Sequence, residues 1–296
     1  MDYLIKPVDV TELDVRQKVN LLLSETFGEP VSDDQVEKAT QTNSSSDSLY
    51  LAAVIEDEII GFNAFISHDL ILNGATVNAY QSCWTATSDA HRGKKIFQNL
   101  INTAKDILLA RNAAFIFGFP NTNSQPIFTK KLGFREIPSL KWQVPNIGAV
   151  MAFYVKIPKT DVASLEINSI QQNDRQLIDL KKKKYQDELL LAEYDDSFVW
   201  GTKRRAKRFG INLQYFEIGG MSIGNPQNVK PLFTSLCRKM HKINYFQLTS
   251  SFENSYHEFF NNLRPAQTND LIVFDLNLKT ERDLRFNFFG GVKDVF

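Results

Sequence analysis

The chain has 296 residues, of which 43% are apolar, and it carries 34 basic and 34 acidic side chains. This length suits one large domain or two of ordinary size, and the composition is that of a globular protein. The charge balance gives no electrostatic reason to expect a nucleic acid or an anionic membrane as partner. Neither a signal peptide nor a run of roughly 20 apolar residues that would span a bilayer is expected. Cys83 and Cys237 are too few for a disulfide framework, and we expect two thiols in a reducing cytoplasm.

The first half of the sequence alternates predicted strands and helices. A short strand is predicted at residues 4–8, followed by a helix over 11–27 that Thr11 caps and a second helix over 32–39. A polar loop covers residues 41–48. The strands that follow are expected at residues 49–55, 59–67, 70–71 and 77–87.

Residues 85–97, TATSDAHRGKKIF, have the pattern of a strand end, a tight turn and the start of an amphipathic helix over 92–111. The first N–H groups of a helix have no partner inside it, and they lie at the positive end of the helix dipole. Both features favour a phosphate group, and Arg92, Lys94 and Lys95 add positive charge at the same place. The sequence therefore predicts a phosphate site for a nucleotide-like cofactor at this turn.

The turn resembles the acyl-CoA-binding motif of the GNAT acetyltransferases, written Arg/Gln-x-x-Gly-x-Gly/Ala. Arg92 matches the first position and Gly93 gives the Arg-Gly-x variant, whereas Lys95 stands where the family has glycine and Phe97 where it has glycine or alanine. A buried strand over 113–119, a second helix and the closing sequence KKLGF follow in the family's order. The resemblance covers about half of the chain, roughly its first 145 residues.

The resemblance implies that the backbone amides of residues 93–97 hold the pyrophosphate of acetyl-CoA. It also implies that residues 84–87 pair with the pantetheine arm, with an amide near Trp84 or Thr85 facing the thioester oxygen. Asn121 and Asn123 either bond the cofactor or cap a helix. The residues assigned to the cofactor are Trp84, Thr85, Ala86, Thr87, Arg92, Gly93, Lys94, Lys95, Ile96, Phe97, Asn121, Asn123 and Phe128.

The catalytic groups are less defined by the sequence. Many family members place a tyrosine before the Gly-Phe close to protonate the leaving thiolate, and the corresponding residue here is Phe128 or Thr129. The catalytic candidates are Tyr80, Asp89 and His91, with His68 and Cys83 also close to the expected site. No metal site is predicted.

The second half loosely repeats the order of the first, without a basic turn before its helix over 229–242. We therefore expect an α/β (α+β) protein of two GNAT-like mixed-sheet domains packed side by side, the second degenerate. The domains are expected at residues 1–155, which bind acyl-CoA, and 156–296, with a substrate or structural role. Among the basic clusters, residues 181–184 are expected on a solvated helix face, and residues 203–208 are a candidate site for an anionic sugar nucleotide. Further elements are expected at residues 165–167, 175–188, 213–223, 245–249, 253–263, 271–278 and 284–289.

The predicted function is transfer of an acetyl group from acetyl-CoA to the amine of a small acceptor such as an amino sugar, as in members associated with polysaccharide biosynthesis. Two alternatives stay open: an acyl-CoA-binding protein without turnover, and an aminoacyl transferase of the Fem type, which would bind charged tRNA. Beyond the small-molecule acceptor, no nucleic acid or membrane is expected as a partner, and a homodimer is left open.

Overall fold

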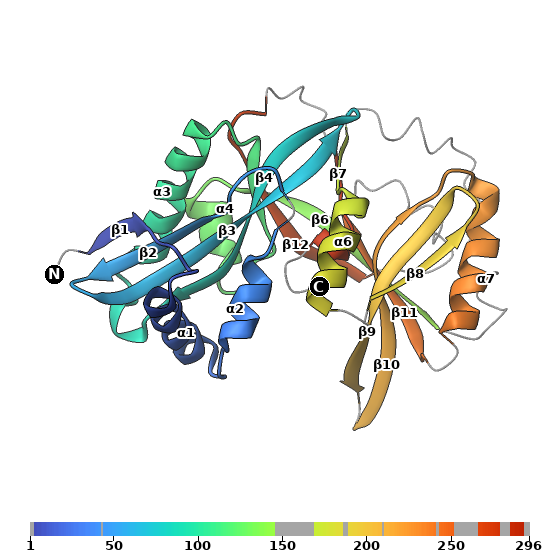
Figure 1. The fold of residues 1–296 in the computed structure, drawn as a ribbon, viewed down its shortest axis with the longest axis horizontal. Helices are drawn as coiled ribbons and strands as arrows, with labels where there is room; N and C mark the ends of the chain where they lie inside the picture. The colour runs from blue at the N-terminus through green and yellow to red at the C-terminus, as the bar shows by residue number, and fades with distance from the viewer. Residues whose placement is uncertain are drawn as a thin grey trace. The chain divides into compact units, whose positions relative to one another are not determined.

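The computed structural model describes residues 3–42, 44–145, 169–185, 189–208, 210–240, 243–251, 266–278 and 285–292 (Figure 1). The chain divides into two compact units. Unit 1 comprises residues 1–70, 76–136 and 270–279, and unit 2 comprises residues 71–75, 137–269 and 280–296. Neither unit is one continuous segment, and the predicted boundary between residues 155 and 156 lies outside the described residues.

Unit 1 is built on a mixed sheet. Its strands, in order across the sheet, are β1 (Leu4–Pro7), β2 (Leu49–Ile55), β3 (Glu58–Leu72), β4 (Ala75–Thr87), β5 (Phe115–Gly118) and β12 (Ala266–Asp275). β4 and β5 are parallel, whereas β1 with β2, β2 with β3, and β5 with β12 are antiparallel. The parallel pair needs a crossover connection, and α3 (Ile96–Ala110) supplies it.

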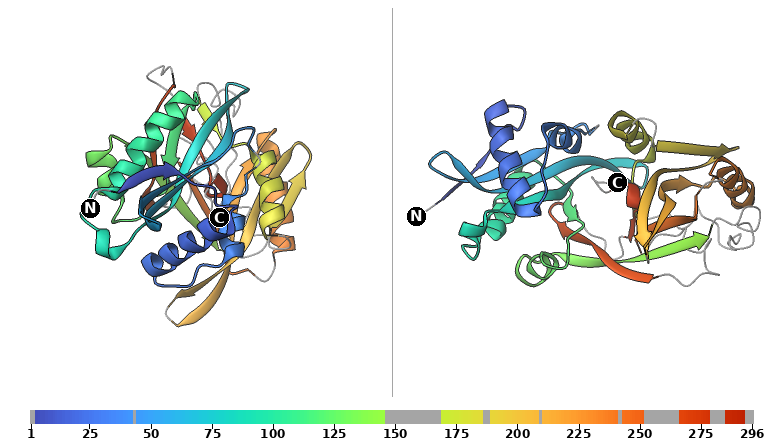
Figure 2. Two further views of the ribbon diagram at one scale, coloured as in Figure 1. Left: turned by 60° about the vertical axis from the view of Figure 1, so that its left-hand side comes forward. Right: turned by 90° about the horizontal axis from the view of Figure 1, so that it is seen from below.

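Helices cover both faces of this sheet, as Figure 2 shows from below. On one face, α1 (Leu13–Phe27) and α2 (Asp33–Thr40) bury Leu22, Leu23 and Val36 against alternate residues of β3. On the other face, α3 and α4 (Gln125–Lys131) bury an apolar stripe against β2, β4 and β5. The stripe on α3 consists of Ile96, Leu100, Ile101, Ala104 and Leu108, at the three- and four-residue spacing of a helix face.

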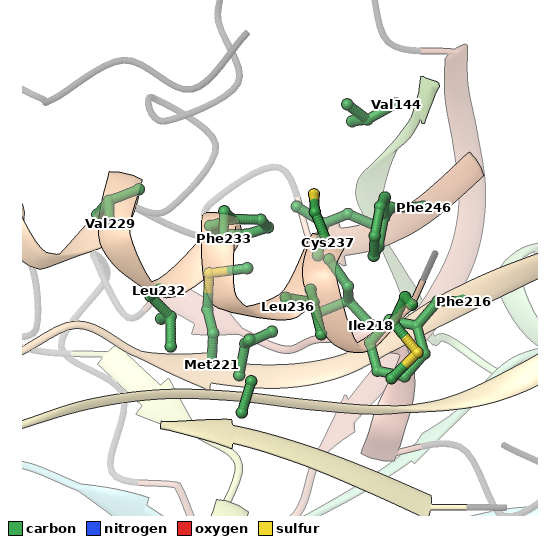
Figure 3. Close-up of a cluster of buried hydrophobic side chains, with 14 of the residues drawn as sticks. Val144, Phe216, Ile218, Met221, Val229, Leu232, Phe233, Leu236, Cys237 and Phe246 are labelled. Atoms are coloured by element: carbon green, nitrogen blue, oxygen red, sulfur yellow. The ribbon is translucent and has the colours of Figure 1, made fainter. Parts of the chain in front are cut away.

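The main strands of unit 2 are hydrogen-bonded in the order β6 (Arg135–Pro145), β11 (Tyr245–Ser251), β10 (Ile211–Ser222), β9 (Ser197–Arg208) and β8 (Leu189–Tyr194). β10 and β11 are parallel and α7 (Val229–Lys239) connects them. Figure 3 shows how Leu232, Phe233 and Leu236 of α7 pack with Phe216 and Phe246 of these strands. The unit also contains α6 (Asp174–Tyr185) and the parallel pair of β7 (Ser169–Gln171) and β13 (Arg285–Asn287).

β5 and β6 each pair with a strand from a distant part of the chain. β6 follows α4 in sequence, yet it pairs with β11, for example through Trp142 and Leu248. β5 pairs instead with β12, which places Phe274 opposite Ile116. The mixed α/β fold class predicted from the sequence is confirmed, and this exchange of strands was not predicted.

Several local predictions need correction. α3 begins at Ile96 rather than at residue 92. The N-cap of α1 is Glu12 and not Thr11, whose hydroxyl and N–H both donate to the carboxylate of Asp9. The strands β6, β8 and β9 were not predicted, and residues 70–71 belong to the long strand β3. The predicted strand at 165–167 and helix at 253–263 lie outside the described residues.

The lysine run on α6 is not a solvated face. Lys181 and Lys184 are buried, whereas Lys182 and Lys183 are exposed. A spacing of three residues puts the two buried lysines on the side of the helix that also buries Leu177. Long lysine stems can cover apolar surface in this way. Within the described residues, no helix is long and apolar enough to cross a membrane.

Candidate functional site

The parallel strands β4 and β5 stay paired over four residues only, from Ala79 with Phe115 to Ser82 with Gly118. A Cβ on Gly118 would lie 3.2 Å from the carbonyl oxygen of Ser82, so glycine lets the two backbones meet closely at the last pair. β5 ends there, whereas β4 continues to Thr87. The β4 backbone beyond Ser82 therefore has no partner in β5, and a ligand with amide groups could extend the sheet at this edge.

β4 is irregular at Trp84, whose φ of 51° is in the left-handed region, and the packing on its two sides indicates a β-bulge there. In a regular strand, side chains separated by an even number of residues share a face. Tyr80 packs in the cluster under α3, but Ala86 packs in the cluster under α1 and α2. Cys83 and Trp84, although consecutive, both pack against the second cluster. One extra residue in the strand accounts for both observations.

The side chain of Asn63 on β3 joins the two sides of this bulge. It is fully buried, and its Nδ2 donates to Thr85 Oγ1 at 2.5 Å and to Ser82 Oγ at 3.3 Å. Its Oδ1 accepts from Ser82 Oγ at 3.3 Å. One amide can reach both residues only because the bulge brings Ser82 and Thr85 to the same face of β4.

The turn that follows β4 has two residues in the left-handed region. A 3₁₀ helix (Asp89–His91) leads to Gly93, with a φ of 82°, and then to Lys95, with a φ of 61°. Lys95 is the N-cap of α3, and its carbonyl oxygen accepts from the N–H of Asn99 at 3.0 Å. The family motif has glycine at this position, and glycine is the residue that adopts this conformation without a steric cost.

The turn presents a row of backbone donors. Among the described residues, none accepts a hydrogen bond from the N–H groups of residues 93–98. Arg92, Lys94 and Lys95 are exposed around them, although Arg92 is also paired with Asp89 at 2.6 Å. Free N–H groups, the positive end of a helix dipole and basic side chains together favour an anion such as a pyrophosphate.

Two residues that the sequence analysis missed hold this turn in place. The Tyr3 hydroxyl donates to the carbonyl oxygen of Lys94 at 3.2 Å and accepts from Asn99 Nδ2 at 2.6 Å. Gly61 on β3 has no side chain where Ile96 packs, since a Cβ there would collide with the Ile96 side chain. Nothing local in the sequence indicates either contact, because each joins residues more than thirty positions apart.

The remaining predicted cofactor residues are in or next to α4. Asn121 is exposed, and its Oδ1 accepts from the N–H groups of Asn123 and Ser124 at 3.0 and 2.9 Å, so it forms the turn that starts α4. Phe128 is buried, with ring centroids 5.1 Å from Phe97 and 4.8 Å from Phe134. Its ring is therefore part of the core under α3. Thr129 is half-buried and donates to the carbonyl oxygen of Gln125 at 3.1 Å.

The three catalytic candidates lie in different environments. Tyr80 is buried and its hydroxyl donates to the carbonyl oxygen of Asp47 at 3.2 Å. Asp89 is exposed and paired with Arg92, and the Nδ1 of His91 lies 3.4 Å from Lys94 Nζ. Asp89 and His91 thus lie beside the candidate anion site, whereas the phenol of Tyr80 donates to a backbone carbonyl. His68 is buried against the edge of Phe117, and Cys83 is half-buried beside the bulge.

Comparison with known proteins finds a matching domain in the first half of the chain. Residues 8–137 match the model of the acetyltransferase (GNAT) domain. Among curated proteins, none matches the sequence. A GCN5-related N-acetyltransferase from Kribbella flavida has a TM-score of 0.68 and 11% identity, over 96% of this chain and 74% of that one. Another from Anabaena variabilis ATCC 29413 has a TM-score of 0.63 and 13% identity, over 95% and 75%. A conserved protein from Enterococcus faecalis V583 has a TM-score of 0.67 and 10% identity, over 94% and 74%.

These solved structures share the fold of the chain, and the family model covers the segment that contains the bulge and the anion site. Residues 8–137 therefore match the GNAT acetyltransferase domain, and the resemblance predicted from the sequence is confirmed over this segment.

Proposed function

We propose that this GNAT domain transfers an acyl group from acetyl-CoA to the amine of a small acceptor, by direct attack while both substrates are bound. The observation that carries the proposal is the row of N–H groups at residues 93–98, which have no acceptor among the described residues and are ringed by exposed basic side chains. Such donors would hold the pyrophosphate of the cofactor.

The rest of the cofactor would follow β4. Its pantetheine amides could extend the sheet along residues 83–87, where β5 has ended. The thioester would then be close to the bulge at Trp84, whose backbone would stabilise the negative charge that develops on the thioester oxygen. Most of the rate would come from this stabilisation and from positioning.

The acceptor would be a small amine, with an amino sugar as the specific candidate. We assign unit 2 a substrate or structural role, since its elements β8, β9, β10, α7 and β11 repeat the order of β2, β3, β4, α3 and β5. That repeat supports a degenerate second GNAT-like domain. The thiols of Cys83 and Cys237 support a cytoplasmic enzyme, and a homodimer stays open.

Thermal unfolding with acetyl-CoA, against adenosine diphosphate as a control, tests the cofactor. A ligand at about 100 times its dissociation constant stabilises the native state by roughly 2.7 kcal/mol, which raises the melting temperature by several degrees. An amine screen for release of free thiol then tests the reaction. Equal shifts with the two ligands would contradict binding of the acyl-pantetheine part.

Acyl-CoA binding without turnover is the second candidate. It is favoured by the absence of a tyrosine at residues 128 and 129, where many family members have one that acts as an acid. The loss does not disable the reaction, because a thiol has a pKa near 8.5 and its thiolate leaves readily near neutral pH. A thermal shift with acetyl-CoA and no thiol release from any amine would favour this candidate.

A further inference from the structure

We propose that the side-chain hydroxyl of Thr85 donates a hydrogen bond to the thioester carbonyl oxygen of the bound acyl donor. This role rests on the proposed acyl transfer and adds a side-chain donor to the backbone of the bulge. The reaction needs charge stabilisation at this place, because negative charge develops on the thioester oxygen as the amine attacks.

The hydrogen bonds of Thr85 set the direction of its proton. A threonine hydroxyl has one hydrogen to donate and two lone pairs to accept with. Asn63 Nδ2 donates to Thr85 Oγ1 at 2.5 Å, so a lone pair of the hydroxyl faces β3. The hydroxyl hydrogen must then point away from Asn63, and among the described residues none accepts it.

Asn63 is held so that it can keep this orientation. It is fully buried, and its Oδ1 and Nδ2 both bond Ser82 on the other side of the bulge. β3 at this point is paired in register with β2, with Asn63 opposite Leu51. A buried amide with every contact satisfied on a central strand has little freedom to turn.

The location of Thr85 matches the place where charge would develop. Thr85 is half-buried, directly follows the left-handed Trp84, and shares a face of β4 with Ser82, where the pairing with β5 ends. That face also carries α3, whose first turn forms the anion site. A cofactor held at α3 and extended along β4 would bring its thioester past this hydroxyl.

In the reaction, the acceptor nitrogen forms a bond to the carbonyl carbon and the C=O pair moves onto oxygen. The C=O bond then re-forms as the C–S bond breaks, the pair leaves with sulfur as the thiolate, and the amine loses a proton to water or to a base. Thr85 keeps its own proton throughout. Its hydrogen bond strengthens as the oxygen becomes negative, which lowers the barrier.

The test combines Thr85→Val, which removes the hydroxyl at nearly constant shape, with Thr85→Ser, which restores it. The first readout needs no turnover: the infrared stretch of bound acetyl-CoA labelled with ¹³C at the carbonyl. We expect a higher frequency in Thr85→Val than in the parent protein and in Thr85→Ser. The second readout is kcat for thiol release, expected to fall about 100-fold in Thr85→Val with little change in the KM for acetyl-CoA. Thr234→Val on α7 is the matched control.

An unchanged carbonyl frequency in Thr85→Val, with acetyl-CoA bound, would overturn the role of Thr85 and leave the proposed function intact. Failure of the parent protein to bind acetyl-CoA in the thermal assay would overturn the proposed function, and the role of Thr85 with it.

Discussion

The turn between β4 and α3 and the turn between β10 and α7 both lead from a strand into the helix that connects a parallel strand pair. In unit 1 the N–H groups of residues 93–98 have no acceptor among the described residues. In unit 2 the corresponding polar groups bond within the protein: Ser197 Oγ accepts from the N–H of Gly224, and Asn225 Oδ1 from that of Gln227. The two turns have the same topology, yet the first presents unbonded N–H groups among the described residues, whereas N–H groups of the second bond to side chains of the protein.

The charges at the two turns differ as well. Asn228 at the start of α7 donates to both Asp195 and Asp196, and a Cβ on Gly224 would collide with the carboxylate of Asp196. Carboxylates thus occupy the place where unit 1 has Arg92, Lys94 and Lys95. Negative charge near a helix N-terminus stabilises the helix, so this arrangement favours the fold and opposes phosphate binding.

The bulges show the same contrast. β10 shifts register against β9 between Ile218 and Gly220, much as β4 is interrupted at Trp84. Here the space is filled, because a Cβ on Gly220 would collide with Asp174, which accepts from Trp200 Nε1 at 2.7 Å and Gln172 Nε2 at 2.6 Å. In unit 1 the residue that follows the bulge is Thr85, whose hydroxyl hydrogen has no acceptor in the described part of the chain.

The largest expected difference between the two turns is whether they bind acetyl-CoA at all. We expect the full chain to bind one equivalent of acetyl-CoA, at the β4–α3 turn, and none at the β10–α7 turn. Isothermal titration of the purified protein measures the ratio directly. If the protein bound a second equivalent of acetyl-CoA, and Lys95→Glu still bound it, unit 2 would also bind the cofactor. The two turns would then not differ in the way that we propose.

Asp174 gives the second prediction. Burial raises its pKa to about 7, against the hydrogen bonds from Trp200 and Gln172 that lower it. The folded state then binds the proton of Asp174 more tightly than the unfolded state does. The contribution of this residue to the free energy of unfolding is therefore greatest below about pH 4, and it is lost as the pH rises through about 7. Asparagine cannot ionise, so at pH 8 the free energy of unfolding of Asp174→Asn should exceed that of the parent protein by up to about 4 kcal/mol.

Urea denaturation at pH 4 and pH 8 measures this difference. The parent protein and Asp174→Asn should be close in stability at the lower pH and separate at the higher one. An equal gap at both values would mean that Asp174 is ionised throughout, and that the filled bulge of unit 2 tolerates its charge.

Charge reversal at the first turn is expected to have the next largest effect. Lys95→Glu puts a carboxylate beside the free N–H groups and removes one ammonium, so the affinity for acetyl-CoA should fall about 100-fold, as expected for loss of a charged contact of about 2.7 kcal/mol. Lys230→Glu, at the exposed start of α7, is the matched control and should leave the affinity unchanged. Competition binding measures both. Equal affinity in Lys95→Glu and the parent would show that the phosphates lie elsewhere.

Local patterns were sufficient to predict the strand-turn-helix of unit 1. Its apolar spacing and its basic residues are contained within residues 85–108, and both are visible without tertiary structure. The hairpin of β8 and β9 was missed because Lys203, Arg204 and Arg205 were interpreted as a charge cluster, although the exposed residues 203, 205 and 207 alternate with the half-buried residues 204 and 206. A strand with one polar face shows this alternation.

The parts that could not be predicted depend on contacts between distant residues. The pairing of β6 with β11 joins Trp142 to Leu248, and hydrophobic pattern alone does not select among partner strands. Likewise, the orientation of the Thr85 proton depends on Asn63, and the sequence pointed to Thr85 only through its backbone. Even the burial of Lys181 follows from which face α6 turns inward.

The smallest effect concerns Lys95 itself, which differs from the family's glycine. Its φ of 61° is costly for a side chain, so Lys95→Gly should raise the free energy of unfolding by about 0.5 kcal/mol. Lys94 is outside the left-handed region, so Lys94→Gly should lower the free energy by a similar amount, since glycine adds freedom to the unfolded chain. Denaturation of the two variants measures these opposite signs.

Acetyl-CoA affinity in Lys95→Gly then separates two explanations for the lysine. If its ammonium contacts a phosphate, the variant gains stability and loses affinity, and the lysine is kept at a cost to the fold. If only the N–H groups bind, affinity stays unchanged or rises with the relaxed turn, and the strain at Lys95 has no counterpart in binding. Unit 2 has no comparable balance between fold stability and phosphate affinity, because the carboxylate of Asp196 lies against its turn at Gly224.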